Sequence, residues 1–455
     1  MSRHVIIGRL GAKDKTVIPA RIGEVATQLQ FVQATKRLDH GIGFALDDLA
    51  KLNIFPTEIG VDLLILAAHV HAADTRLSRD TESQDNWTRE IRLVVPVSDV
   101  SRWSNATAVL SRILNFLTGD LWIIEFRSRP SGFEKTVKPR PLQFTKPPFN
   151  ELSLFSGGLD SLIGAIDSLE PGRNPLFISH AGEGAVSAAQ DGLFNKLQKN
   201  YKDRPFDRLR IWMSFPEGLV KDVPSDKSTR ARSLLFFATG VFAGTGLGPG
   251  ITLRVPENGL IALNVPLDPL RLGALSTRTT HPFYMARWNE LVGILGISVP
   301  IRNPYWDKTK GEMIASCANS TLLKRIIPDT LSCASPTKAR WRGHGTEHCG
   351  YCLPCLIRRA AIRSGFGKND PTTYTLADLT EKVLDTTQAE GRQVRSFQFA
   401  IDRLKKQPRL ASLLIHKPGS LADQSPAEQK ALAEVYRRGM NEVSVLLAGV
   451  QTAPS

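Results

Sequence analysis

The sequence lacks the long hydrophobic runs of membrane-spanning helices and the dense cysteine pattern of small secreted domains. Its most apolar stretch, residues 233–250, is interrupted by glycines and a proline, which predicts a core helix leading into a loop. No basic and apolar leader opens the chain, so nothing in it indicates secretion. Five unevenly spaced cysteines argue against a disulfide framework and favour a metal site in a reducing compartment. We therefore expect a cytoplasmic protein with no membrane partner.

Acidic residues are the scarcer charged class, 44 against 58 lysines and arginines, which leaves a formal net charge of +14. This balance attracts polyanions, so nucleic acids, nucleoside triphosphates and acidic protein partners all stay open as ligands. No block of Lys and Arg interleaved with aromatic residues marks a nucleic-acid groove. With 42% hydrophobic residues over 455 positions, the chain is long enough for several domains and a large core.

One short loop is the most specific feature. An apolar run at residues 152–155 precedes a Ser-Gly-Gly turn, and apolar residues at helical spacing follow as far as residue 169. Glycines let backbone N–H groups approach a ligand, and a helix N-terminus favours a phosphate. No Gly-Lys-Ser/Thr follows, so this is not a Walker A loop. The alternative is an ordinary turn in which Asp160 and Ser161 only cap the helix. The expected nucleotide-binding residues of the loop are Phe155, Ser156, Gly157, Gly158, Leu159, Asp160 and Ser161.

Strand and helix patterns alternate from residue 152 onward, which predicts a parallel α/β sheet. After the first strand, we expect strands at 175–179, 209–214 and 251–255, and helices at 184–199 and 230–244. Ligands of such sheets bind at the carboxyl ends of the strands. This places the loop 156–161, His180, the polar segment 224–229 and Glu257-Asn258 around one crevice, with His180 as a further nucleotide-binding residue.

Three cations are candidates for contacting phosphate. Arg230 and Arg232 begin the predicted helix 230–244, where an arginine can form a forked pair with phosphate oxygens. Lys308 precedes a predicted helix at 311–317 with Asp307 as its N-cap. The alternative for each is a solvent-exposed surface residue.

Four cysteines form the second specific pattern: Cys333 upstream, then Cys349, Cys352 and Cys355 at C-x2-C-x2-C spacing. Four thiolates are what a closed tetrahedral Zn²⁺ site needs, and an iron–sulfur cluster is the competing use. His344 or His348 could replace a cysteine ligand. The fifth cysteine, Cys317, is predicted to be a buried, inert thiol.

The flanking regions carry no chemical motif. Residues 1–128 predict a small α+β domain, 129–148 a Pro-rich basic linker and 368–455 a helical extension. In the first region we expect helices at 56–74 and 99–117, the second capped by Asp99, and strands at 89–97 and 121–126. In the last we expect helices at 376–384, 394–404 and 425–447. We expect Asp62, Asp74 and Arg76 to lie on a solvated helix face.

Ser-Gly-Gly-x-Asp-Ser after a strand resembles the PP-loop of N-type ATP pyrophosphatases, which have the adenine nucleotide α-hydrolase-like (HUP) fold. Together with Thr330-Leu331-Ser332-Cys333 and the later cysteines, it is similar to the 7-cyano-7-deazaguanine synthase (QueC) family over residues 152–365. The resemblance implies a carbon–nitrogen ligase that uses ATP, with Mg²⁺, to adenylate 7-carboxy-7-deazaguanine, and then transfers an amine. It implies a PP-loop domain over residues 149–367 with structural Zn²⁺. The catalytic candidates are Ser156, Asp160, Ser161, Arg230, Arg232 and Lys308.

The resemblance does not extend to the N-terminal region or the tail, but the larger architecture with an added N-terminal domain is similar to the QueC-like QatC subunits of bacterial Qat anti-phage systems, which implies a defence role and protein partners from one operon. The family's residues after the second and fourth strands are absent here, where residues 180–184 and 256–259 stand instead. The amine acceptor therefore stays open between ammonia and a partner protein. A tRNA-modifying PP-loop enzyme and a non-catalytic nucleotide-binding scaffold are the two rival hypotheses.

Overall fold

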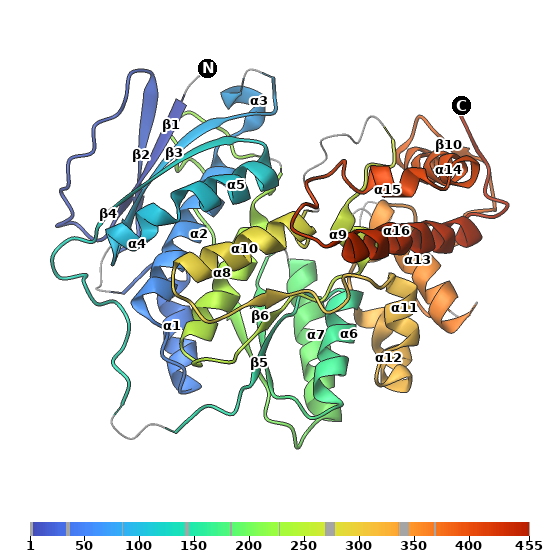
Figure 1. Cartoon of the computed structure of the whole chain (residues 1–455), viewed down its shortest axis with the longest axis horizontal. Helices are drawn as coiled ribbons and strands as arrows, with labels where there is room; N and C mark the ends of the chain where they lie inside the picture. The colour runs from blue at the N-terminus through green and yellow to red at the C-terminus, as the bar shows by residue number, and fades with distance from the viewer. Residues whose placement is uncertain are drawn as a thin grey trace.

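The computed structural model describes residues 3–32, 37–83, 85–141, 145–182, 184–226, 228–268, 278–334, 336, 345–367 and 370–454. Over these ranges the protein is α/β, built on two larger sheets whose strands are all parallel (Figure 1). The N-terminal sheet lies on the left of Figure 1, the central sheet in the middle and the C-terminal helices on the right. None of the described helices combines the length and apolarity that crossing a membrane requires.

The N-terminal sheet has the order β2-β1-β3-β4. Its strands are β1 Arg3–Arg9, β2 Glu24–Gln30, β3 Glu90–Val97 and β4 Leu121–Ser128. The helices of this region are α1 Ile42–Lys51, α2 Glu58–Arg76, α3 Arg79–Glu82, α4 Val100–Asn105 and α5 Thr107–Thr118. Helices α2 and α5 pack against β3 and β4, and Ile6, Leu93 and Ile124 join the main core.

Two sequence expectations for this region are wrong. The sheet is entirely parallel with helices between its strands, so the region is α/β rather than α+β. The helix expected over 99–117 is two helices, because a tight turn in which the Ala106 N–H bonds to the Trp103 carbonyl separates α4 from α5. Asp99 does cap α4, accepting from the Arg102 N–H at 3.0 Å. Hydrophobic periodicity does not register a single tight turn within an apolar stretch.

The central sheet has the order β7-β6-β5-β8-β9, and its neighbours are all parallel, as the alternation predicted. Its strands are β5 Glu151–Leu154, β6 Pro175–His180, β7 Asp207–Ile211, β8 Leu253–Arg254 and β9 Ile301–Arg302. Helices α6 Leu159–Leu169 and α7 Gly184–Asn200 share a core with one face of the sheet. On the other face lie α8 Arg232–Thr245 and α10 Pro282–Ile294. Strand order reverses at β5, so the crevice beside β5 is the topological switch point of this sheet.

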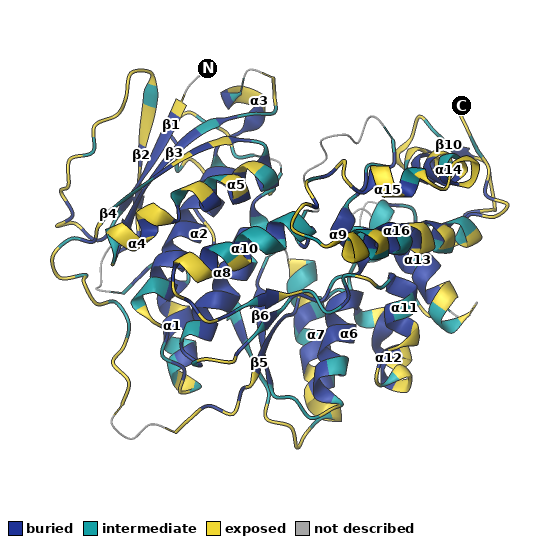
Figure 2. Ribbon diagram, viewed as in Figure 1, coloured by how far each residue is buried: buried dark blue, intermediate teal, exposed yellow. Residues whose placement is uncertain are grey.

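The two larger sheets share one hydrophobic core, which runs from Ile6 to Ile301. Helix α2 packs directly on α8, and both are buried along most of their length (Figure 2). This burial overturns the expected solvated face of α2, since Asp62 and Asp74 are 0% exposed. Arg76 is also held in place, because its guanidinium donates to the Phe215 and Pro216 carbonyls. The amphipathic pattern could not reveal this, because α2 is covered on all sides.

In the 129–148 segment, the first residues are bound to helix α2 by ion pairs and hydrogen bonds. Arg129 is 7% exposed and pairs with Asp62 and Glu58 of α2. Glu58 also accepts from the Thr136 N–H at 2.7 Å and the Val137 N–H at 3.1 Å. Charged pairing to α2 therefore holds the first residues after β4 against the N-terminal unit.

The remaining elements are mainly helices that lie to the right of the central sheet in Figure 1. They are α9 Gly259–Leu263, α11 Lys310–Ala315, α12 Ser320–Ile326, η2 Ile327–Asp329, α13 Leu353–Phe366, β10 Leu384–Asp385, α14 Ala389–Lys406, α15 Leu410–Leu414, α16 Pro426–Leu446 and β11 Thr452–Ala453. Ser425 caps α16 in a capping box with Glu428. The helix expected at 376–384 is wrong: this stretch is irregular and leads into β10.

Candidate nucleotide pocket and metal centre

The loop between β5 and α6 is a tight turn. Gly157 has φ +82°, a left-handed conformation that favours glycine. Ser156 is exposed at the turn, and its Oγ accepts from the Gly158 N–H at 3.3 Å and lies 3.2 Å from the Ser161 Oγ. Ser161 Oγ also donates to the Gly158 carbonyl at 2.9 Å. The two serines therefore form a compact pair of hydroxyls where α6 begins.

Asp160 faces away from this hydroxyl pair. Its Oδ2 accepts from the Asn258 backbone N–H at 3.1 Å and from the Asn258 side chain at 2.7 Å. Its Oδ1 lies 2.9 Å from Lys310 Nζ, and both side chains are almost fully buried. Asp160 thus joins the loop to the segment after β8 and to the start of α11, and it acts as a positioning residue in this structure.

A cavity of about 610 Å³ opens beside the loop, at the carboxyl ends of the central strands. Its lining combines loop serines, arginines and one carboxylate with apolar side chains. The polar side chains that line it include Ser156, Ser161, Ser179, His180, Gln190, Arg230, Arg232, Glu257, Arg278 and Thr279. The structure therefore brings together the loop, His180, Arg230, Arg232 and Glu257, as the strand order required.

Arg230 and Arg278 enter the cavity from segments held by the N-terminal unit. Arg230 Nη1 donates to the Thr118 carbonyl at 2.9 Å, and Arg278 Nη1 donates to the Phe116 carbonyl at 2.9 Å. The Arg230 guanidinium also lies 3.8 Å from the ring centre of Trp87. Burial, together with the charge of Arg230, lowers the pKa of Arg278 to about 10, so both stay charged at neutral pH. The end of α5 therefore holds two cations at the wall of the cavity.

The segment before α8 is held by the same unit. The Ala231 N–H donates to Asp74 Oδ2 at 2.8 Å, and Asp226 Oδ2 accepts from the Arg79 N–H at 2.8 Å. Asp74 belongs to a buried network with Arg79, Arg89 and Asp120. The N-terminal unit thus helps to set the position of the arginine-bearing segment. Sequence reasoning missed this role, since no local pattern links residues so far apart.

His180 ends β6 and lines the cavity, as predicted. Its ring lies 5.9 Å from that of His71 and 5.7 Å from that of Phe236. Burial, with the nearby His71 and Arg232, lowers the pKa of His180 to about 3. The imidazole is therefore neutral at pH 7, when it can offer one donor and one acceptor to a ligand.

Lys308, the third predicted phosphate-contacting cation, lies outside the set of residues that line the cavity. Its Nζ donates to Ser316 Oγ at 2.9 Å. The cation at the loop is Lys310, the first residue of α11. Asp307 does not cap this helix, because Thr309 and Glu312 form a capping box instead. The Thr-x-x-Glu spacing was the signal that could have corrected both.

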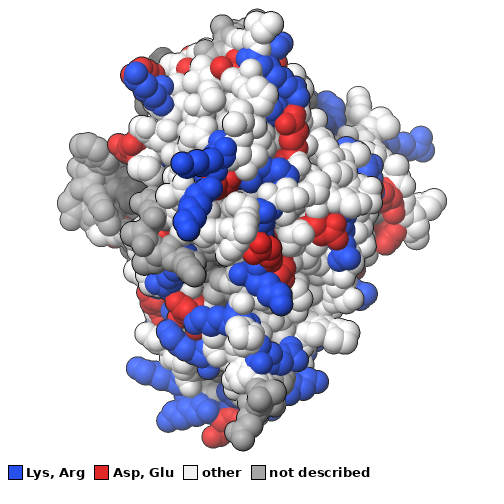
Figure 3. All heavy atoms as spheres, turned by 90° about the vertical axis from the view of Figure 1, so that its left-hand side faces the viewer, with Lys and Arg blue, Asp and Glu red and all other residues white. Residues whose placement is uncertain are grey.

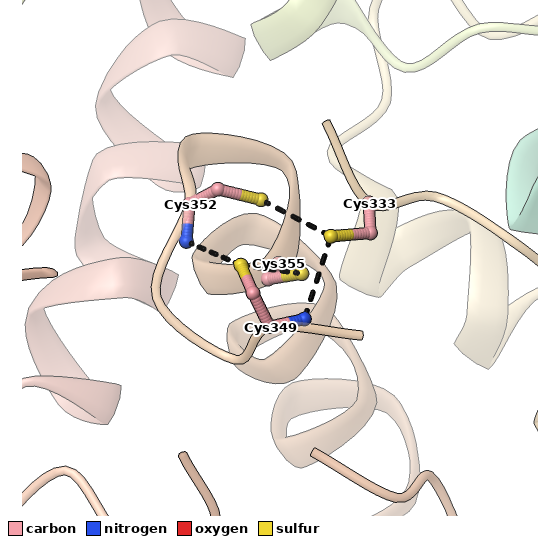
Figure 4. Close-up of side chains that lie close together, drawn as sticks. All are labelled: Cys333, Cys349, Cys352 and Cys355. Carbon is pink, nitrogen blue, oxygen red and sulfur yellow. Dashed lines mark hydrogen bonds between the residues drawn. The ribbon is translucent and has the colours of Figure 1, made fainter. Parts of the chain in front are cut away.

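The four predicted cysteines lie close together and form one cluster (Figure 4). Their sulfur atoms all lie within 4.8 Å of one another, with Cys333 to Cys352 and Cys349 to Cys355 both at 3.9 Å. Zn–S bonds of about 2.3 Å in a tetrahedron require sulfur separations of about 3.8 Å. The group could therefore hold a metal ion such as zinc. Cys317 lies outside it, buried at 8% exposure, and burial raises the pKa of its thiol to about 12.

Local structure brings these cysteines together. Gly350 has φ +87°, and a Cβ there would lie 2.5 Å from the Leu376 carbonyl oxygen. Cys352 is the N-cap of α13 and Cys355 lies in its first turn. The buried Arg358 donates to Thr330 Oγ1 at 2.6 Å and ties α13 to the segment that bears Cys333.

His348 is not a member of the cluster. Its Nε2 accepts from the Ser332 N–H at 3.2 Å, and among the described residues the group that could hold a metal ion there consists of the four cysteines. His344, the other alternative ligand, lies outside the described residues. The four-cysteine interpretation is therefore the one that the described residues support.

The two residues that precede Cys333 form hydrogen bonds with the loop between β5 and α6, and so connect the cysteine cluster to this loop. The Leu331 N–H donates to the Gly157 carbonyl at 2.9 Å, and the Leu159 N–H donates to Ser332 Oγ at 3.2 Å. A Cβ on Gly158 would lie 3.5 Å from that hydroxyl. The segment that leads into the cysteine cluster therefore supports the turn, and its Leu331 also lines the cavity.

Comparison with known protein families, with curated proteins and with solved structures gave no match to this chain. The function must therefore be argued from the site itself.

Proposed function

We propose that the protein is an ATP-dependent ligase that adenylates a carboxylate of the 7-carboxy-7-deazaguanine type and then transfers it to an amine. The observation that carries this proposal is the cavity at the switch point of the central sheet. The Ser156–Ser161 hydroxyl pair, at the N-terminus of α6, lines it together with Arg230, Arg232 and Arg278. Hydroxyl donors, a helix N-terminus and cations converging in one cavity fit a polyphosphate.

In the proposed reaction, a carboxylate oxygen attacks the α-phosphorus of ATP and the bond to the leaving pyrophosphate breaks. The loop and its serines hold the phosphates, while Arg230 and Arg232 stabilise the charge that develops on them. The neutral His180 offers a hydrogen bond to the nucleotide. Asp160 and Lys310 keep the loop and the segment after β8 in register. An amine then displaces AMP from the acyl-adenylate.

The Zn²⁺ and Mg²⁺ ions implied by the family resemblance differ in how well the described residues could bind them. Zn²⁺ fits the cysteine cluster, where the short sulfur separations suit one tetrahedral ion better than a cluster of several irons. Its role would be structural, because four thiolates leave no open position. Asp160 is not free to bind Mg²⁺, since both its oxygens are engaged by Asn258 and Lys310, and the carboxylate among the described residues that line the cavity is Glu257.

The decisive experiment is to identify the nucleotide products after incubation with ATP and 7-carboxy-7-deazaguanine. We expect AMP and pyrophosphate, dependent on the carboxylate, and loss of both in Ser156→Ala. Glu290→Gln, which removes a surface partner of Arg112 at 2.6 Å, is the matched control and should retain them. ADP and phosphate, or ATP binding without turnover, would contradict adenylation, and the second result would favour the scaffold.

The amine acceptor is tested separately by mass spectrometry of a partner protein from the same operon, in keeping with the proposed defence role. A mass increase equal to an amide-linked deazaguanine supports transfer to protein. Free 7-cyano-7-deazaguanine with an unmodified partner would show that ammonia is the acceptor.

The tRNA-modifying alternative rests on net charge alone. Figure 3 shows Lys and Arg on one face of the molecule interspersed with Asp and Glu and with uncharged residues, rather than gathered in one continuous patch. Tight RNA binding that weakens steeply with salt would revive this alternative.

A further inference from the structure

Glu257 occupies a distinctive place in the nucleotide cavity. It follows β8, the strand beside β5, so it stands across the switch point from the Ser156 loop. Among the described residues that line the cavity, it is the one carboxylate, facing a lining that includes Arg230, Arg232 and Arg278. A carboxylate repels phosphate oxygens directly, so Glu257 would act either on a Mg²⁺ ion that bridges the phosphates or on the reacting acyl and amine groups.

Hydrogen bonds fix the backbone of Glu257 and one of its carboxyl oxygens, whereas the second carboxyl oxygen is open to a ligand. Asn303 Nδ2 donates to the Glu257 carbonyl at 2.8 Å, and the Glu257 N–H donates to Asn303 Oδ1 at 3.4 Å. Thr280 Oγ1 donates to the side-chain Oε2. The second carboxyl oxygen, Oε1, forms no hydrogen bond with a described residue. One oxygen is therefore oriented by protein and the other is available to a ligand.

The neighbouring carboxylate, Asp160, is different because Lys310 and Asn258 already engage both its oxygens. Glu257 has no such cationic partner at contact distance among the described residues. Burial, with a smaller contribution from Asp160, raises the pKa of Glu257 to about 7, while Lys310 and Thr280 oppose the shift. A carboxylate of this kind can both accept and release a proton near neutral pH.

We propose that Glu257 is the general base of the second half-reaction: it takes the proton from the amine that attacks the acyl-adenylate. The inference rests on the proposed function. The amine nitrogen forms a bond to the acyl carbon, its proton passes to Glu257 Oε1, and the bond from that carbon to the AMP oxygen breaks. AMP leaves with the electron pair, and no oxidant or other reactant is needed.

The test separates the two half-reactions. Adenylation is measured as exchange of labelled pyrophosphate into ATP, dependent on 7-carboxy-7-deazaguanine. Aminolysis is measured as amide formed from ammonium and, separately, as hydroxamate formed from hydroxylamine. Hydroxylamine is largely unprotonated at pH 7, so it needs far less help from a base than ammonium does.

In Glu257→Gln we expect exchange to persist and the ratio of hydroxamate to amide to rise by about 100-fold or more, in line with the usual contribution of a general base. Glu257→Asp, which keeps a carboxylate on a shorter side chain, should give an intermediate ratio. Glu290→Gln should leave the ratio at its wild-type value.

Three results would overturn the inference. Equal loss of amide and hydroxamate in Glu257→Gln would point to a role in binding the acyl group. Loss of exchange in a folded Glu257→Gln protein would mean that Glu257 serves adenylation. Absence of exchange in the wild-type protein would remove the proposed function and the base role together, and this outcome is distinct because it appears before any substitution is made.

Discussion

The cysteine cluster and the cavity beside the β5–α6 loop are built in opposite ways. The cluster takes its four ligands from a single stretch, residues 333–355, and they form one buried group of one chemical type. The cavity takes its lining from residues 154–331, and two of its arginines are held by the N-terminal unit. The four cysteines could therefore be predicted from local spacing, whereas for the cavity the sequence indicated the loop, His180, Arg230, Arg232 and Glu257 but neither Arg278 nor the support from the N-terminal unit.

The two regions are nevertheless in contact, because Leu331 and Ser332 bond to the loop and Cys333 follows directly. Stability of the cluster and geometry of the loop are therefore expected to be coupled.

Removing one metal ligand should have the largest effect. Cys349→Ser should lose the bound Zn²⁺ and with it much of a binding free energy on the order of 10 kcal/mol, so that the protein unfolds or aggregates. Elemental analysis and thermal unfolding measure both. Cys317→Ser is the matched control, and it should keep one Zn²⁺ per chain because Cys317 lies outside the cluster. Iron with labile sulfide in the wild-type protein, or no metal, would contradict this prediction.

Substitutions in the loop should differ in their effect on stability, because Asp160 is buried and Ser156 is exposed. Asp160→Ala leaves the buried Lys310 without its partner, so we expect a loss of about 3–5 kcal/mol in the free energy of unfolding as well as loss of AMP formation. Ser156→Ala alters an exposed residue, so it should abolish AMP formation with a stability change of about 0.5 kcal/mol or less. Urea unfolding with product analysis checks both. Equal stability of the two variants would mean that the Asp160–Lys310 pair does not hold the loop in place.

Acid should weaken the cavity region before the cluster loses its metal. Burial lowers the pKa of His71 to about 4 and that of His180 and His281 to about 3, from 6.5 in the unfolded chain. Because the unfolded state binds protons more readily, stability is full above pH 6.5 and declines as pH falls from there towards 3.

Between pH 7 and pH 5, each of these histidines should cost up to about 2 kcal/mol. Urea unfolding at the two pH values gives the change, and metal analysis at pH 5 separates it from loss of Zn²⁺. A free energy of unfolding that rises towards pH 5 would be the opposite of this expectation.

The smallest effect tests whether the N-terminal unit belongs to the cavity. Trp87→Ala removes the ring under Arg230, which should weaken ATP binding about two- to fivefold, as expected for a partly exposed cation–π contact. Titration calorimetry with a non-hydrolysable ATP analogue provides the measurement. Trp212→Ala, a tryptophan that is 59% exposed and whose indole N–H donates to Ser214 Oγ, is the control. An unchanged dissociation constant in Trp87→Ala would confine the nucleotide site to the central sheet.

The sequence by itself determined the features that depend on short-range chemistry. Alternating strands and helices indicated a parallel sheet, the Ser-Gly-Gly turn indicated the end of that sheet at which the cavity opens, and cysteine spacing indicated a cluster that could hold a metal ion. Each is visible locally, because periodicity, turn geometry and ligand spacing are properties of neighbouring residues.

Only the tertiary structure decided which polar residues are buried and which cations reach the cavity. Asp62 and Asp74 looked like surface charges and are core residues, because α8 and the segment around Arg129 cover α2. Lys310 rather than Lys308 meets Asp160, because the capping box fixes where α11 begins. Such outcomes depend on packing between segments far apart in the chain, and burial of a charge is favourable only when a distant partner is already in place.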